Sequence, residues 1–177
     1  MVAGLTRTLS KWRGEKFMDH ASIDAFIKKA EITELIHRYF AALDQRDFAA
    51  TTMHLLFAED ARIVRPNGAA TVGPQTIGES HRTSFARFRA TQHMASGLIV
   101  TLPDHEQAEF RGNLVAMHLW AEGLGDPTVP SQDNYFLAGG VLSGKAVLTT
   151  QGWRITHLAN DVIWRKGTGF QQILQTQ

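Results

Sequence analysis

The chain has 177 residues, of which 44% are hydrophobic and 20% are charged, and its formal net charge at pH 7 is +1. This composition is typical of one folded domain and excludes a disordered chain, while the small net charge disfavours nucleic acid or an anionic membrane as a partner. The chain has no cysteine, which excludes disulfides, thiol nucleophiles and thiolate metal sites and fits a cytoplasmic location.

The first residues carry a different pattern from the rest of the chain. Residues 1–21 contain four basic residues and lack the apolar stretch of a secretory signal, so we expect a flexible arm there. We expect a single domain over residues 22–177, because no repeat or linker divides that stretch. No apolar run approaches the roughly 18 residues of a membrane helix.

A helix is predicted from Ser22 to Asp44, because apolar residues recur there at helical spacing. Ser22 is a candidate N-cap, and Asp47 is a candidate cap for a second helix that ends near Phe57. The helical spacing does not select Asp44 over Asp47 as a functional carboxylate. The apolar positions are Phe26, Ile27, Ala30, Leu35, Ile36, Tyr39, Phe40 and Leu43.

The second part of the chain changes from helical to strand patterns. A short strand is predicted over residues 61–64, followed by a turn at residues 66–68 and a third helix from Pro74 to about Arg89. Four longer strands follow, and the third is expected to bend because glycines interrupt it. Helices followed by an antiparallel sheet predict an α+β fold. The longer strands are expected over residues 94–102, 108–121, 135–150 and 153–165.

Two histidines are expected on one face of this sheet. Residues 103–106 form a turn, and if it is centred between His105 and Glu106, then His93 and His118 face each other directly. Facing side chains have Cβ atoms about 4.5–5.5 Å apart. His118 alternates in phase with apolar residues and with Trp120, so the pair suggests a pocket. Two ordinary buried histidines remain the alternative, and a single bulge would break the pairing.

Several motifs carry a family resemblance that covers about residues 30–165. The segment Tyr39-Phe-Ala-Ala-Leu-Asp44-Gln-Arg-Asp47-Phe48 and the segment at residues 57–61 resemble the SnoaL-like branch of the nuclear-transport-factor-like superfamily. The scytalone dehydratases are the most similar group. Residues 43–48 are similar to the segment with their catalytic aspartate, residues 91–97 to the strand with a catalytic histidine, and His118 retains the spacing of their second histidine. Residues 152–164 retain the spacing between two tryptophans.

The resemblance implies a cone-shaped α+β barrel, in which helices pack on a strongly curved antiparallel sheet around an internal pocket. It implies Asp44, His93 and His118 as the catalytic residues. The candidate substrate-binding residues are Tyr39, Arg65, Trp120 and Asn160.

The resemblance also implies a reaction class, namely dehydration or cyclisation of a small aromatic or polyketide-like carbonyl compound without a cofactor. An aspartate that orients a histidine makes His93 the candidate base, and His118 or Arg65 could stabilise the negative charge of an enolate. Two tyrosines that hold a water on the substrate carbonyl in those dehydratases are replaced here by Leu43 and Arg65. The reaction type is therefore carried over and the substrate is not.

Three other functions remain open. A dehydrohalogenase shares the aspartate–histidine pair, but the positions of its lysine and its last-strand arginine read Tyr39 and Leu158 here. The same fold also serves as a non-catalytic ligand-binding or subunit-docking module. Two histidines and a carboxylate could bind a metal, although no His-x-His spacing supports a metal site.

A homo-oligomer, either a dimer or a trimer, is expected from the last strand. Trp153, Ile155, Val162 and Trp164 predict a convex sheet face that is more apolar than one layer of helices can cover. The remaining expected partner is a small-molecule substrate.

Overall fold

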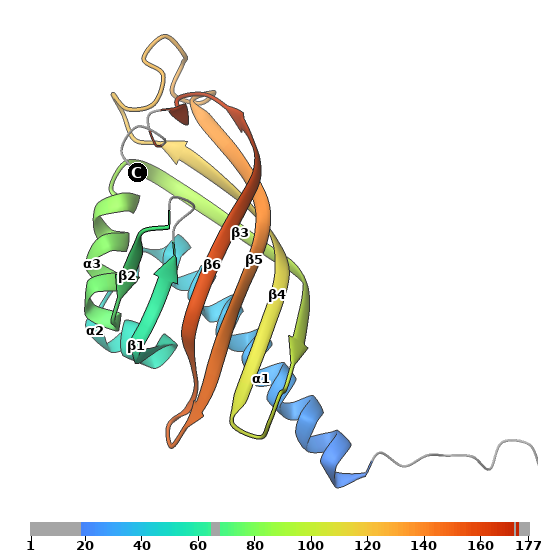
Figure 1. Cartoon of the computed structure of the whole chain (residues 1–177). Helices are drawn as coiled ribbons and strands as arrows, with labels where there is room; N and C mark the ends of the chain where they lie inside the picture. The colour runs from blue at the N-terminus through green and yellow to red at the C-terminus, as the bar shows by residue number, and fades with distance from the viewer. Residues whose placement is uncertain (1–18, 65–67, 172, 174–177) are drawn as a thin grey trace, which may run out of the picture.

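Three helices precede the long strands and cover part of a curved sheet (Figure 1). The computed structural model describes residues 19–64, 68–171 and 173. The helices are α1 (His20–Gln45), α2 (Ala50–Leu56) and α3 (Pro74–Phe85). The strands are β1 (Phe57–Val64), β2 (Ala70–Val72), β3 (Phe88–Thr101), β4 (Gln107–Trp120), β5 (Tyr135–Thr149) and β6 (Gly152–Gly167).

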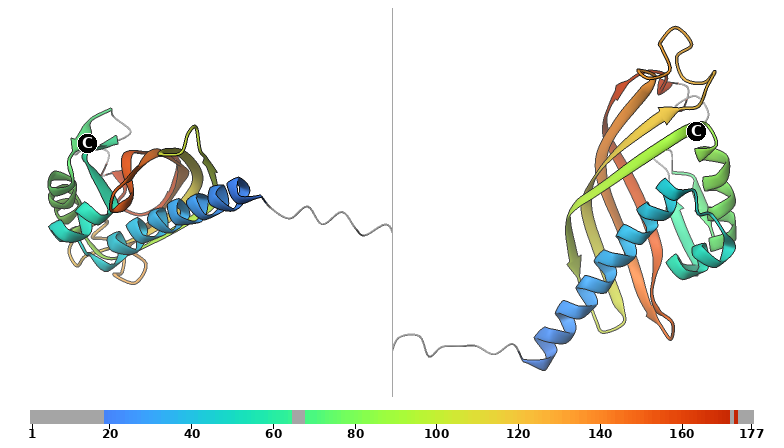
Figure 2. Two further views of the ribbon diagram at one scale, coloured as in Figure 1. Left: turned by 90° about the horizontal axis from the view of Figure 1, so that it is seen from below. Right: turned by 180° about the vertical axis from the view of Figure 1, so that it is seen from behind.

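Helix α1 begins earlier than predicted. Asp19 is its N-cap and accepts a hydrogen bond from the backbone N–H of Ser22 at 2.7 Å, so the predicted cap at Ser22 was wrong. The C-terminal half of the predicted apolar stripe is buried, whereas Phe26 and Ile27 are 66% and 50% exposed. Phe26 and Ile27 are exposed because they lie in the N-terminal part of α1, which extends beyond the sheet (Figure 2). None of the described helices is long and apolar enough to cross a membrane.

The shorter helices differ from prediction at their ends. Ala49, and not Asp47, is the N-cap of α2, although the Asp47 carboxylate accepts from the Thr52 hydroxyl at 2.8 Å within this first turn. Helix α3 begins at Pro74 as predicted and ends at Phe85, because the chain already enters β3 at Phe88. Part of the predicted turn at residues 66–68 lies outside the described residues.

The sheet has six strands in the order β2-β1-β6-β5-β4-β3 and is not closed. Strands β3 to β6 are joined by consecutive antiparallel pairs, as predicted. The predicted antiparallel sheet has one exception, because β1 lies parallel to β6. Consecutive strands joined by hairpins must run antiparallel, and β1 and β6 have no such connection.

Glycines in β5 allow the sheet to bend as the sequence predicted. A Cβ atom at Gly139 would lie 2.2 Å from the Trp164 indole, and one at Gly140 would lie 2.1 Å from the Asp161 carbonyl oxygen. The pairing of β5 with β6 shifts register at this point. The concave face that results packs against α1 and forms the core.

The predicted convex apolar face is only partly present. Trp153 and Ile155 are 5% and 0% exposed, because this end of β6 packs into the core against the helices. Val162 lines the internal pocket, and Trp164 alone of the four is exposed, at 46%. The homo-oligomer remains a prediction.

Candidate active site

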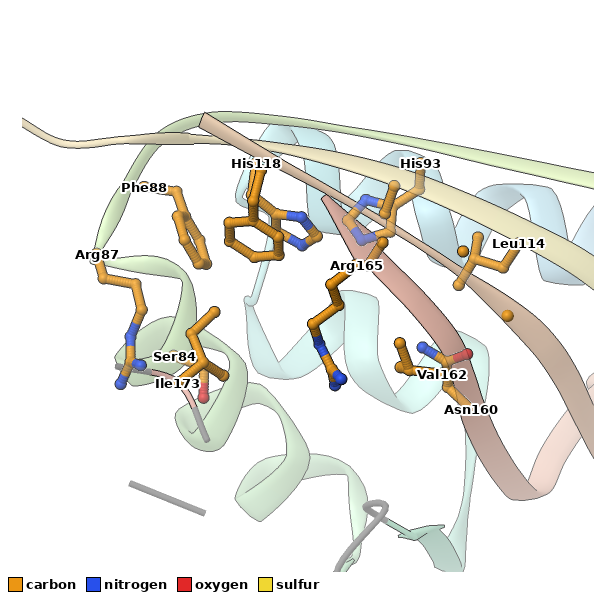
Figure 3. Close-up of a pocket in the computed structure, with 15 residues that line it drawn as sticks. Ser84, Arg87, Phe88, His93, Leu114, His118, Asn160, Val162, Arg165 and Ile173 are labelled. Atoms are coloured by element: carbon orange, nitrogen blue, oxygen red, sulfur yellow. The ribbon is translucent and has the colours of Figure 1, made fainter. Parts of the chain in front are cut away.

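A cavity of about 230 Å³ lies on the concave face of the sheet, beside the end of α3 (Figure 3). Its walls come from β3, β4, β5 and β6, from the turn that follows α3, and from the C-terminal segment. The lining residues are Ser84, Arg87, Phe88, His93, Leu114, Ala116, His118, Phe136, Ala138, Gly139, Gly140, Asn160, Val162, Arg165 and Ile173.

Asp44 and His93 are joined at one side of this cavity. Asp44 lies in the last turn of α1, and its Oδ1 is 2.6 Å from His93 Nδ1. The same carboxylate accepts from the backbone N–H of His93 at 2.8 Å and from the Thr91 hydroxyl at 3.0 Å. Thr91 and His93 are two residues apart on β3, so both side chains point to the same face of the strand and meet the end of α1.

This contact sets the hydrogen-bonding roles of the two imidazole nitrogens. An ionised carboxylate only accepts hydrogen bonds, so Nδ1 carries the proton and Nε2 remains the acceptor for a group in the cavity. The His93 side chain is 6% exposed, and its ring stacks on Phe40 at 5.5 Å. Burial lowers the pKa of His93, and the hydrogen bond to Asp44 opposes that shift. The result is a neutral, oriented base near pH 7.

His118 lies beside His93, but not in the predicted pairing. His118 pairs with Thr91 and His93 pairs with Ala116, so the expectation that the two histidines face each other directly was wrong. The hairpin centres on His105, and the register shifts once more between Ser96 and Ile99. The different hairpin centre and the register shift each move the pairing by one residue, so together they leave both histidines on one face of the sheet. Their rings make an edge contact at 5.7 Å.

The surroundings of His118 favour an uncharged ring. Its imidazole stacks on Phe136 with centroids 4.3 Å apart and planes 3° from parallel. Burial and, to a smaller extent, the nearby His93 lower the pKa of His118 to about 3. Its Nδ1 is buried without a hydrogen-bond partner among the described residues. A neutral ring can stabilise negative charge in the cavity through a hydrogen bond, but not through a positive charge of its own.

Arg46 places a fixed positive charge behind the dyad. It ends α1 in the left-handed conformation, with φ of 61°. Its guanidinium lies 5.0 Å over the Phe85 ring and donates to the Phe88 carbonyl at 3.3 Å. The positive charge of Arg46 lowers the pKa of both His93 and His118, after the larger effect of burial.

The four predicted substrate-binding residues lie in different environments. Tyr39 is buried in the core, where its hydroxyl is 3.2 Å from His81 Nε2, and it does not line the cavity. Trp120 is also buried, and its indole donates to the Thr168 carbonyl behind the cavity wall. Asn160 lines the cavity, and its Oδ1 is buried with no partner in the described chain. Arg65 lies outside the described residues.

Two lining arginines were missed by the sequence analysis. Arg165 reaches the cavity because β6 has one extra residue opposite the Gly139–Gly140 step, which reverses the alternation after Val162. Arg87 lies in the turn between α3 and β3, which the sequence analysis assigned to a helix. A predicted bulge at the paired glycines of β5 was the signal that could have identified Arg165.

Among residues 19–64, 68–171 and 173, no group of three or more histidine, aspartate or glutamate side chains is arranged to hold a metal ion. His118 meets His93 through a ring contact, and the Asp44 carboxylate is engaged by Thr91 and His93.

Comparisons with known proteins agree with this architecture. The family described as "SnoaL-like domain" matches residues 25–159. The crystal structure of the Kfla4162 protein from Kribbella flavida is 25% identical, with a TM-score of 0.73, and covers 80% of this chain and 95% of that one. None of the curated proteins matches the chain.

Two further solved structures share the fold at lower identity. A protein from Novosphingobium aromaticivorans named "Putative Scytalone Dehydratase" is 15% identical, with a TM-score of 0.71 over 82% of this chain and 91% of that one. The hexachlorocyclohexane dehydrochlorinase LinA-type3 from Novosphingobium barchaimii is 14% identical, with a TM-score of 0.68 over 82% and 92% of the two chains. At these identities the similarity concerns the fold alone.

Proposed function

Because the chain belongs to the SnoaL-like domain family, with a match over residues 25–159, we propose that it is a lyase or cyclase that works without a cofactor. Its substrate is a small aromatic or polyketide-like carbonyl compound, from which it eliminates water or in which it closes a ring. One observation carries this proposal. His93 lines a cavity, and its Nδ1 lies 2.6 Å from the Asp44 carboxylate that orients it.

Dehydration needs a proton to leave the carbon next to a carbonyl group. His93 Nε2 takes this proton, and the electron pair of the C–H bond forms an enolate. Asp44 stabilises the imidazolium that results. The enolate then expels the hydroxyl group of the neighbouring carbon, which receives the proton from His93 and leaves as water. Positioned acid–base groups of this kind contribute about 10²–10⁴-fold to the rate.

Ring closure uses the same groups. The enolate carbon attacks a second carbonyl in the same molecule, a carbon–carbon bond forms, and His93 returns its proton to the new alkoxide. His118 stabilises the enolate in either reaction as a neutral hydrogen-bond donor, because its pKa of about 3 keeps the ring uncharged near pH 7.

Exchange of the α-proton in D₂O tests the shared first step without knowledge of the later one. A panel of aryl ketones with a hydroxyl group on the β-carbon is followed by NMR. The His93→Gln variant should exchange the α-proton at least about 10²-fold more slowly than the unaltered protein. His105→Gln is the matched control, because His105 lies in the exposed β3–β4 turn.

Exchange at an unaltered rate in His93→Gln would overturn the proposed base. Tight binding of the same ketones with neither exchange nor turnover would instead favour the non-catalytic binding module.

A further inference from the structure

The charged groups of the cavity are of one sign. Arg87 and Arg165 line it, and none of the aspartates and glutamates that the structure describes does. Asp44 lies behind His93, and its two oxygens already accept from His93 and Thr91. The cavity therefore presents positive charge to a molecule that enters it.

The two guanidinium groups have no partner within the described parts of the chain. Neither takes part in the four ion pairs found there, and neither donates to a backbone carbonyl, whereas Arg46, Arg82, Arg89 and Arg154 all do. Both residues are partly buried. Partial burial of an unpaired charge costs free energy, and a bound ligand of opposite charge offsets this cost.

The arginines lie apart from the reacting groups. Figure 3 shows His93 and His118 on one wall, while the side chains of Arg87 and Arg165 extend away from the two imidazoles and lie on opposite sides of Ser84 and Ile173. A ligand whose reacting carbon lies at His93 can therefore place another part of the molecule at a guanidinium group. Guanidinium presents paired N–H donors that match the two oxygens of a carboxylate.

The volume of the cavity limits the size of the ligand. A cavity of about 150 Å³ lined by apolar groups holds one benzene molecule. The cavity here, at about 230 Å³, accommodates one ring with a short substituent. Phe88 and Phe136 supply aromatic wall for such a ring.

From these observations we infer that the substrate is a single-ring compound with an anionic oxygen group, a carboxylate in the simplest case, which Arg165 binds at a distance from His93 and which the charge of Arg87 attracts. This inference rests on the proposed function for the location of the reacting carbon. The anion-binding role itself does not depend on turnover.

Benzoate and benzamide test the inference, because they have nearly the same size and shape and differ in charge. Calorimetric titration of the purified chain should show that benzoate binds at least about tenfold more tightly. Arg165→Gln should weaken benzoate binding about 10- to 100-fold and leave benzamide binding unchanged. Arg87→Gln should show the same selectivity with a smaller loss, and Arg165→Lys should retain part of the affinity.

Arg111→Gln is the matched control, because it removes the same charge from an exposed position on β4 and should leave benzoate binding intact. Thermal unfolding of each variant shows whether it is folded, and a folded Arg165→Lys that recovers affinity supports the inference even where Arg165→Gln is unstable. Equal affinity for the two probes, no binding of either probe, or unaltered benzoate binding in a folded Arg165→Gln would overturn it.

His93→Gln separates this inference from the proposed function. The preference for benzoate should persist in this variant, although proton exchange is lost. A benzoate preference that depends on Arg165, in a protein that exchanges no α-proton, would refute the catalytic proposal and leave the anion site standing. Exchange that His93→Gln abolishes and that Arg165→Gln leaves intact, with no preference between the probes, would refute the anion site alone.

Discussion

Two sides of the cavity differ in whether their buried polar atoms have hydrogen-bond partners. On the α1 side, the Asp44 carboxylate accepts three hydrogen bonds from Thr91 and His93. On the β4 and β6 side, His118 Nδ1 and Asn160 Oδ1 are buried with no partner among the described residues. A buried polar atom without a partner costs about 1–3 kcal/mol, so a native fold retains such atoms mainly where something else can complete them.

Some polar groups of the cavity are therefore oriented before a ligand binds, and others are not. The Asp44–His93 pair has its hydrogen-bonding roles fixed by the fold, which suits a base that must be oriented in advance. The β4 and β6 side has polar groups that only a bound molecule or water can complete, which suits recognition. The four predictions below test this division between an orienting side and a recognition side.

Asp44→Asn should have the largest effect, because an amide can stabilise the wrong tautomer of His93. The amide N–H of the new side chain would donate to Nδ1 of His93, whereas the Asp44 carboxylate accepts from it. The imidazole proton would then move to Nε2, and the base would be lost. Activity should fall about 10²–10⁴-fold while the protein remains folded, as measured by α-proton exchange and thermal unfolding. Asp161→Asn, at an exposed position of β6, is the control. Activity within a few-fold of the unaltered protein would contradict the orienting role.

His118 should make the stability depend on pH. The unfolded chain binds a proton at His118 below its ordinary pKa of 6.5, and the folded chain binds it only near its pKa of about 3. Stability from this residue is therefore complete above pH 6.5 and is lost as the pH falls toward 3. Between about pH 7 and about pH 4 the loss should be on the order of 3 kcal/mol.

Urea unfolding at these two pH values measures the effect. The His118→Gln variant should lose less stability on acidification than the unaltered protein, and His105→Gln should behave like the unaltered protein. An identical pH dependence in His118→Gln would show that the ring is not held neutral by burial.

Features that depend on neighbouring residues were predictable from the sequence, and contacts between distant segments were not. Helices and strands follow from periodicity, and α1, β4, β5 and β6 appear close to their predicted places, whereas β3 begins at Phe88 and not at Met94 as predicted. Asp44 could not be chosen over Asp47 by periodicity, and it was the motif around it that singled it out. The parallel pairing of β1 with β6 joins segments far apart in the chain, which no local pattern encodes.

The site depended on register, which the sequence predicts poorly. In β3–β4, the hairpin centre differs from the predicted one, and the register shifts between Ser96 and Ile99. These two differences cancel in their effect on the face, so His93 and His118 still meet. In β5–β6, the shift between Gly139 and Gly140 is not followed by a second shift before Arg165, and it turned Arg165 inward. One extra residue reverses the facing of every later side chain, so bulges decide which residues line this cavity.

Thr91→Val should have a moderate effect on the orienting side. The variant retains the shape of the side chain and removes the hydroxyl that donates to Asp44 Oδ1 at 3.0 Å. A hydrogen bond to a charged group contributes about 1.5–3 kcal/mol, so the free energy of unfolding should fall by about 1.5 kcal/mol. Thr76→Val, at an exposed position of α3, is the control for the exchange of hydroxyl for methyl. A variant as stable as the unaltered protein would mean that the Asp44 carboxylate does not need its third donor.

Asn160→Leu should have the smallest effect, and its sign distinguishes the two sides of the cavity. On the orienting side, loss of a polar group leaves other groups without partners and lowers stability. Asn160 Oδ1 has no partner to lose in the part of the chain that the structure describes, so an apolar side chain of similar size should leave the free energy of unfolding unchanged within about 0.5 kcal/mol or raise it. The recognition role predicts a cost in binding instead. KM should rise about 2- to 10-fold with kcat little changed, which is the range of one neutral hydrogen bond. Asn113→Leu, exposed on β4, is the control for the exchange itself. A loss of stability in Asn160→Leu with KM unaltered would place Asn160 among the structural residues and would remove the distinction between the two sides.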